Sequence, residues 1–215
     1  MKKLIQTCIF ALMLFSVSTG LFSETITFSA DKMQGNTSES DKYTKLIGRA
    51  HIKTESLEIS ADEITLSGED FRFISAKGSV NGKNSEAGFD FNCGSMSYDR
   101  ETKIALLEHN VRMIDKANDV NASAQIIEYT QETENAVMQV NVSIKQKENV
   151  CSGAVAIYRK AEQVLELSGN ARIERGKDLF RAQEIQLNIK TEAITMDGKV
   201  RGSAASNSES KAGGQ

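Results

Sequence analysis

The chain has 215 residues, of which 40% are hydrophobic and 26% are charged, with no Pro or Trp and a formal net charge of −3 at pH 7. This balance is typical of one or two globular domains and argues against a disordered polymer. Because the charge is slightly acidic and no Lys/Arg-rich stripe with interleaved aromatic residues is present, we expect no nucleic-acid partner.

The first 23 residues have the layout of a secretory signal peptide. Lys2 and Lys3 precede an apolar run from Leu4 to Phe15, and small and polar residues follow up to Ser23. The run is interrupted by polar residues and is shorter than the ~20 apolar residues of a spanning helix, although a retained inner-membrane anchor is the alternative. We therefore expect an exported, periplasmic protein whose leader, residues 1–23, is cleaved.

Residues 24–202 contain six imperfect copies of one pattern. In the copy at Leu57–Leu66, apolar and polar residues alternate up to Ala61, and the next apolar residue, Ile64, has the opposite parity. We interpret this change as a β-bulge or corner between Ala61 and Ile64, at which one extra residue bends the first strand of the unit around its interior. The small residue before the change recurs roughly every 30 residues, at Ala30, Ala61, Cys93, Ala124, Gly153 and Ala182.

Each copy has a second half in which apolar and small residues alternate without a break. Examples are Leu46–Ile52, Leu165–Ile173 and the inward set Met138, Val140 and Val142. Polar turns separate the halves and the copies, so that each repeat predicts two strands and two turns, and six repeats predict twelve strands.

The pattern predicts an all-β fold, because strands with one apolar face must bring those faces together. The simplest solution is an elongated antiparallel β-jelly-roll, a folded-over, taco-like sheet built from six two-strand repeats, with open edge strands at both ends. The Ser/Gly/Ala-rich residues 203–215 are expected to form a disordered tail.

The repeats resemble those of the OstA-like (LptA) family of periplasmic lipopolysaccharide-transport proteins. The similarity is carried by Phe28–Met33 at the start of the mature chain, by Leu57–Leu66 and by Leu165–Ile173, and it covers approximately residues 25–202. It implies a jelly-roll whose groove shields the lipid A acyl chains of lipopolysaccharide, or of a similar glycolipid, during transport to the outer membrane. It also implies end-to-end stacking by edge-strand addition with similar jelly-roll modules of inner- and outer-membrane proteins, or head to tail with further copies.

Under this interpretation, lipid is held by burial alone, by interior residues of both strand types. A filled jelly-roll has the same sequence pattern as one that holds a ligand, so ordinary core packing is the alternative at every position. The candidate groove residues are Phe28, Ile59, Ile64, Phe89, Phe91, Met96, Val111, Met113, Ile127, Tyr129, Val142, Tyr158, Phe180, Ile185 and Met196.

The two histidines and the two cysteines of the mature chain predict no metal site. His109 stands where four other units have Gly, and either faces a headgroup phosphate at the rim or has no function, whereas His51 points outward without a second ligand nearby in sequence. Cys93 and Cys151 should both point inward but about four strand spacings apart, near 19 Å. A disulfide needs Cα atoms within about 7 Å, so we expect two buried free thiols.

No catalytic motif stands out, and we expect neither an enzyme nor a cofactor. Acids that follow the small residues, such as Asp31, Asp62 and Glu184, are better explained by turn chemistry than by acid–base catalysis. A parallel β-solenoid acting on polysaccharide would need outward acids and aromatic residues clustered on one wall, whereas the outward residues here are scattered Lys, Ser, Asn and Glu. Two alternatives remain: an anchored LptC-like member of the same fold, and a structural β-scaffold that carries no lipid.

Overall fold

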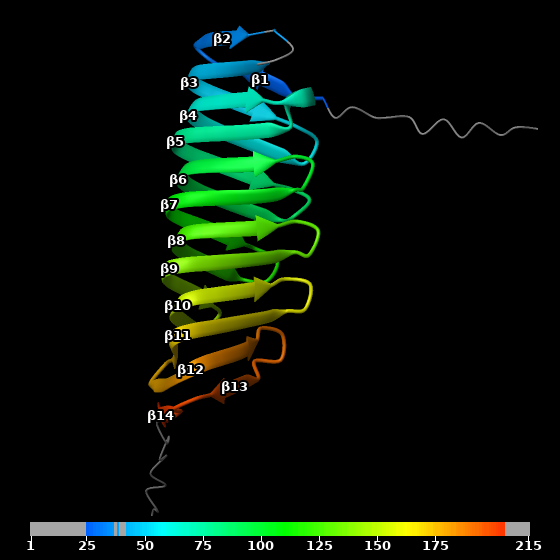
Figure 1. The fold of residues 1–215 in the computed structure, drawn as a ribbon. Helices are drawn as coiled ribbons and strands as arrows, with labels where there is room; N and C mark the ends of the chain where they lie inside the picture. The colour runs from blue at the N-terminus through cyan, green and yellow to red at the C-terminus, as the bar shows by residue number, and fades with distance from the viewer. Residues whose placement is uncertain (1–24, 37, 39–41, 205–215) are drawn as a thin grey trace, which may run out of the picture.

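The computed structural model describes residues 25–36, 38 and 42–204, which form one antiparallel sheet of 14 strands (Figure 1). The predicted leader, residues 1–23, and residues 205–215 of the predicted tail lie outside the described residues. Within the described part, no helix is long and apolar enough to cross a membrane. The elements are β1 (Thr27–Ser29), β2 (Lys32–Asn36), β3 (Tyr43–Lys53), β4 (Leu57–Ser67), a 3₁₀ turn (Glu69–Phe71), β5 (Phe73–Asn84), β6 (Phe89–Asp99), β7 (Ile104–Asp115), β8 (Val120–Thr130), β9 (Asn135–Gln146), β10 (Asn149–Arg159), β11 (Val164–Arg175), β12 (Asp178–Asn188), β13 (Ile194–Asp197) and β14 (Arg201–Ser203).

These 14 elements make the twelve bent strands that the six repeats predict. At one end of the sheet, β1 and β2 pair with the two halves of β3, so that together they make one strand interrupted at its bend. At the other end, β13 and β14 pair with the two halves of β12 in the same way. The predicted all-β, folded-over jelly-roll is therefore confirmed, with an edge strand at each end.

Each long strand from β3 to β12 bends at a corner and contributes to two walls. Figure 1 shows the strands stacked as a column. We call wall A the half that contains Ile64–Ser67 of β4 and the residues paired with it, and wall B the half that contains Leu57–Ala61 and its partners. The inward side chains of both walls form one continuous buried apolar cluster. Burial of this cluster between the walls is the main stabilising term of the fold.

The change of parity in β4 is confirmed, but the extra residue lies in the other strand of the unit. Ser60 of β4 pairs with Asn81 of β5, and Glu63 pairs with Lys77, so two residues of β4 lie opposite three of β5. The prediction of a bulge in the first strand was therefore wrong. The second strand carries the bulge and keeps its parity, and the first strand has one residue fewer at the corner, which is why its parity changes.

Pairs of residues in the left-handed region turn the second strand of each unit at the corner. Glycine adopts this region without strain, and Asn is the next most tolerant residue. Val140, which we expected to face inward, belongs to this series with φ 63°, and the corner turns its side chain outward so that it is 50% exposed. The pairs are Gly48–Arg49, Gly78–Ser79, His109–Asn110, Val140–Asn141, Gly169–Asn170 and Gly198–Lys199.

Candidate lipid-binding interior and its mouth

Twelve of the fifteen candidate groove residues lie in the buried cluster between the walls. The other three lie in the terminal units: Phe28 is 48% exposed, and Phe180 and Met196 are partly buried. Phe28 and Met196 lie in β1 and β13, at the two ends of the sheet, and Phe180 of β12 pairs with Gly202 of β14, which has no side chain to cover it. Lipid contact by all of these residues stays a prediction. The twelve buried ones are Ile59, Ile64, Phe89, Phe91, Met96, Val111, Met113, Ile127, Tyr129, Val142, Tyr158 and Ile185.

The interior is closely packed, including at its most aromatic part. Phe89 meets Tyr129 edge to face, with ring centroids 4.9 Å apart. An apolar cavity here is lined by Phe89, Phe91, Met96 and Tyr129 among others, and its volume is about 30 Å³. This is about the volume that one water molecule occupies in the liquid. An acyl chain therefore requires the two walls to move apart.

The walls are continuous at the corner but are separate at the opposite edge, which we call the mouth. One side of the mouth, rim A, is made by the turns inside the units, at residues 67–73, 99–104, 130–135, 159–164 and 188–194. The other side, rim B, is made by the turns between units, at residues 53–57, 84–89, 115–120, 146–149 and 175–178. Contacts between rim A and rim B decide whether the interior is closed.

A buried ion pair closes the middle of the mouth. It joins Asp115 of rim B to Lys160 of rim A, and Tyr158 of wall A takes part through its hydroxyl. We call these three residues the central latch. The Tyr158 hydroxyl donates to Asp115 Oδ2 at 3.0 Å, and Lys160 Nζ lies 3.3 Å from the same oxygen. Lys160 also donates to the Ala87 carbonyl and lies 4.5 Å from the centroid of the Phe89 ring. The Asp115 side chain is fully buried and that of Lys160 is 15% exposed.

Burial and the neighbouring groups act in opposite directions on the Asp115 carboxyl. Burial alone raises its pKa, but hydrogen bonds from Asn118 and Tyr158 and the charge of Lys160 outweigh burial and hold the pKa below its ordinary value. Asp115 is thus a charged acid inside an apolar mouth. A buried pair of this kind is costly to break from one side, because the remaining charge has no partner.

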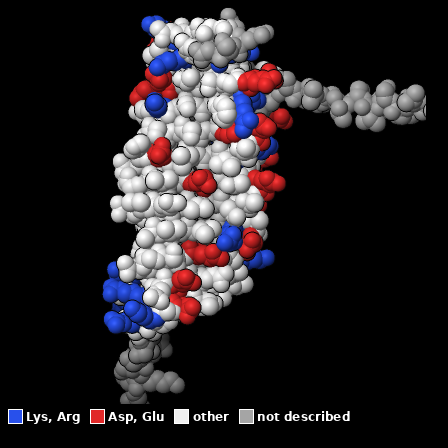
Figure 2. Space-filling model, in the orientation of Figure 1, with Lys and Arg blue, Asp and Glu red and all other residues white. Residues whose placement is uncertain are grey.

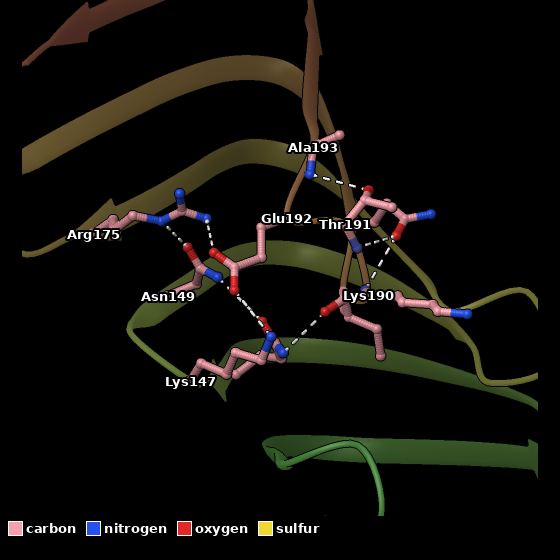
Figure 3. Close-up of polar contacts among 10 residues, drawn as sticks. Lys147, Asn149, Arg175, Lys190, Thr191, Glu192 and Ala193 are labelled. Carbon is pink, nitrogen blue, oxygen red and sulfur yellow. Dashed lines mark hydrogen bonds and ion pairs between the residues drawn. The ribbon is translucent and has the colours of Figure 1, made fainter.

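A second, more exposed group of contacts closes the mouth near the C-terminal end (Figure 3). Lys147 of rim B donates to Glu192 of rim A at 2.9 Å, and Arg175 Nη2 lies 3.5 Å from the same carboxylate. Arg175 Nε donates to Asn149 Oδ1 at 2.8 Å, which fixes the guanidinium. We call this group the end latch. The hydrogen bond from Lys147 is the largest of the effects that lower the pKa of Glu192.

Nearer the N-terminus the mouth is hollowed. Asn84 of rim B and Gln131 of rim A approach through their amides at 3.5 Å, the limit of a hydrogen bond. Beside them, a hollow of about 550 Å³ lies between residues 55–56 and 85–86 of rim B and residues 98–103. Tyr98 lines both this hollow and the apolar cavity behind it. The mouth is therefore thinnest beside the aromatic part of the interior.

Cys93 and Cys151 are both buried and unpaired, as we predicted. Cys93 is in β6 and Cys151 is in β10, which are four strands apart in the sheet. Burial raises the pKa of Cys93 to about 11 and that of Cys151 to about 12, so both thiols stay protonated at neutral pH.

His109 is a corner residue, exposed on the outside, and its Nδ1 lies 3.0 Å from the Ser95 hydroxyl. A Cβ atom placed on Gly94 of the neighbouring strand would lie only 2.7 Å from the Cβ of His109. In the first two units the order is reversed, and Asp31 and Asp62 pack against the corner residues Gly48 and Gly78. His109 is therefore explained by packing against Gly94. In the described part of the chain, no group of His, Cys, Asp or Glu side chains could hold a metal ion.

Sequence reasoning missed the latches, because Asp115 and Lys160 lie next to polar turns that are far apart in the sequence. One signal was present. Asp115 continues the inward parity of Val111 and Met113, and Lys160 continues that of Tyr158, so each charge follows an apolar series into the interior.

Residues 105–164 match the family model described as "LptA/(LptD N-terminal domain) LPS transport protein". Over these residues the chain matches the OstA-like, LptA family. The match runs from β7 to the start of β11 and includes Asp115, Tyr158 and Lys160 of the central latch. The repeats on either side of the match continue the same two-strand units.

Among solved structures, the chain is similar to LptH from Pseudomonas aeruginosa, described as the LptA homologous periplasmic component of the conserved lipopolysaccharide transport device. The two share 8% sequence identity at a TM-score of 0.27, over 86% of this chain and 97% of that one. At this TM-score the likeness carries no weight, and the assignment depends on the family match and on the repeats. No curated protein matches the chain.

Proposed function

We propose that this LptA-family protein is an exported, periplasmic component of a lipid bridge. It carries lipopolysaccharide, or a similar glycolipid, to the outer membrane, with the lipid A acyl chains shielded between wall A and wall B. The observation that supports this most is the continuous apolar cluster, which runs from Leu46 of β3 to Ile189 beyond β12. Only side-chain contacts separate that cluster from solvent along the mouth.

Opening the mouth is energetically accessible to a bound lipid. An acyl chain of about 12 methylenes gains roughly 10 kcal/mol when it leaves water, at about 0.8 kcal/mol for each methylene. Removing one partner of a buried ion pair costs about 3–5 kcal/mol, because the remaining charge stays buried and unpaired, and opening the mouth costs less because water reaches both charges. The burial of one chain therefore offsets the loss of the central latch.

The aromatic part of the interior is the first place where we expect the walls to separate. It has the apolar cavity, the hollow beside Tyr98 and the weak amide contact of Asn84 with Gln131. The buried Tyr129 hydroxyl makes no hydrogen bond within the described residues. A polar group of an incoming lipid would satisfy it. Phe91, Met96 and Tyr129 are thus the strongest candidates for lipid contact among the predicted residues.

The two ends of the stack supply the contacts to other bridge components. Each end strand has a sheet partner on one side only, and it carries exposed apolar side chains: Phe28 (48% exposed) and Met33 (60%) at one end and Val200 (51%) at the other. Such edges accept a further strand. Similar jelly-roll modules of inner- and outer-membrane proteins, or further copies of this chain, would continue both the sheet and the apolar interior.

The closely packed interior favours one other function, that of a structural scaffold that polymerises through its edges without lipid. Native mass spectrometry of the protein purified from its own envelope distinguishes the two. We expect a lipid-mass adduct that Met113→Gln, inside, reduces and that Arg112→Gln, one residue away on the outer face, leaves unchanged. Lipid-free oligomers from both variants and from the unaltered chain would favour the scaffold.

A further inference from the structure

Three arginines lie side by side on the outer face of wall B at the C-terminal end of the stack. Arg172 of β11 pairs directly with Arg181 of β12, and Arg181 pairs directly with Arg201 of β14. We call them the arginine row. Figure 2 shows Lys and Arg side chains gathered at this end of the molecule.

The positive charge of the arginine row is only partly compensated. Neighbouring strands are about 4.8 Å apart, so the backbones of the three arginines span roughly 10 Å, and like charges in directly opposed positions destabilise a sheet. Arg172 pairs with Glu174 at 2.7 Å, but its Nε is buried without a hydrogen-bond partner. The side chains of Arg181 and Arg201 are exposed, and within the described part of the chain they make no hydrogen bond or ion pair.

The arginine row ends on an edge strand. In the described structure β14 pairs only with β12, so its other edge can accept a strand, and a strand that adds there would place an outward side chain directly opposite Arg201. A carboxylate at that position would form a charge-assisted hydrogen bond with the guanidinium.

The N-terminal edge of the same chain does not supply this carboxylate. On the outer face of wall B, direct pairing connects one residue from each strand of that wall into a single line. This line contains no Asp or Glu. If a second copy added head to tail in this register, it would place Ser29 opposite Arg201. The line runs through Ser29, His51, Ser60, Asn81, Asn92, Arg112, Ser123, Ser143, Ser152, Arg172, Arg181 and Arg201.

We infer that the arginine row is a docking surface for a different jelly-roll protein, whose edge strand carries carboxylates on its outward face. The C-terminal edge then prefers that partner to a further copy of this chain. This inference rests on the edge-strand addition of the proposed function and adds to it the charge of the partner.

The test uses the chain itself as the acidic partner. Ser29→Glu with Ser60→Glu places two carboxylates on exposed positions of the line at the N-terminal edge. Sedimentation at low salt should show head-to-tail association about ten-fold tighter than for the unaltered chain. The gain should disappear in 0.5 M salt and when Arg181→Glu and Arg201→Glu are added. Arg112→Glu, in the middle of the line, is the matched control and should keep the gain.

The outcomes separate the two proposals. Equal association of the acidic variant and the unaltered chain would overturn the charge preference while leaving edge-strand addition in place. A gain that survives Arg181→Glu with Arg201→Glu would do the same. Absence of association in every variant would overturn both proposals, because no strand would then add to β14.

Discussion

The two long edges of the folded sheet are held together in different ways. At the corner the backbone itself joins wall A to wall B, through paired left-handed residues repeated in all six units. At the mouth the walls are joined only by side chains, chiefly by the central latch and the end latch. The corner therefore fixes the fold, and the mouth is the edge that can open without loss of the sheet.

This difference predicts that changes at the mouth act on closure and changes at the corner act on bending. The largest expected effect is that of Lys160→Ala, which leaves the buried carboxylate of Asp115 without its cation and should lower the free energy of unfolding by about 3 kcal/mol. Urea denaturation measures it. Lys147→Ala in the exposed end latch is the control and should cost less than about 1 kcal/mol. Equal losses at the two latches would contradict the special role of the buried pair.

At the corner, Gly94→Asp should cost about 2 kcal/mol, because even its Cβ would lie 2.7 Å from the Cβ of His109. Adding His109→Gly should restore most of the loss, since the pair would then match Asp62 with Gly78 of the second unit. Thermal unfolding of the two single variants and the double variant gives the coupling. If the two losses simply add, packing between these positions does not explain His109.

Val140→Gly should stabilise the protein by about 1 kcal/mol, because it relieves a left-handed β-branched residue whose side chain is 50% exposed. The same change at Val142, which is buried, should destabilise it. A loss of stability at both positions would mean that Val140 contributes packing that its exposure does not indicate.

The smallest signal is the pH dependence of the central latch. The pKa of Asp115 is lower in the folded protein than in the unfolded chain, so its contribution to stability is present above the unfolded value near 3.9 and is lost as the pH falls through the folded value. Urea denaturation between pH 3 and 7 should therefore show a shallower loss in acid for Asp115→Asn than for the unaltered chain. If the free energy of unfolding falls equally with pH in both proteins, the charge of Asp115 does not stabilise the closed mouth.

The sequence predicted the units, the strands and the buried cluster because these depend on alternation, which is local. The same local pattern misplaced the bulge, since the parity change is visible in β4 whereas the extra residue that causes it is in β5. It also placed Val140 inside, because alternation alone does not show that the corner backbone is left-handed. The central latch joins Asp115 to Lys160, which are 45 positions apart in the sequence, and no local pattern connects them.

We propose that the interior, and not the outer surface, receives the acyl chains. A photocrosslinking amino acid at position 91, buried beside the apolar cavity, and another at position 92, exposed on the outer face, test it directly. After irradiation in the native envelope, lipid binding between the walls should give a lipid-linked product from position 91 and none from position 92. Equal capture at both positions, or capture at position 92 alone, would contradict it.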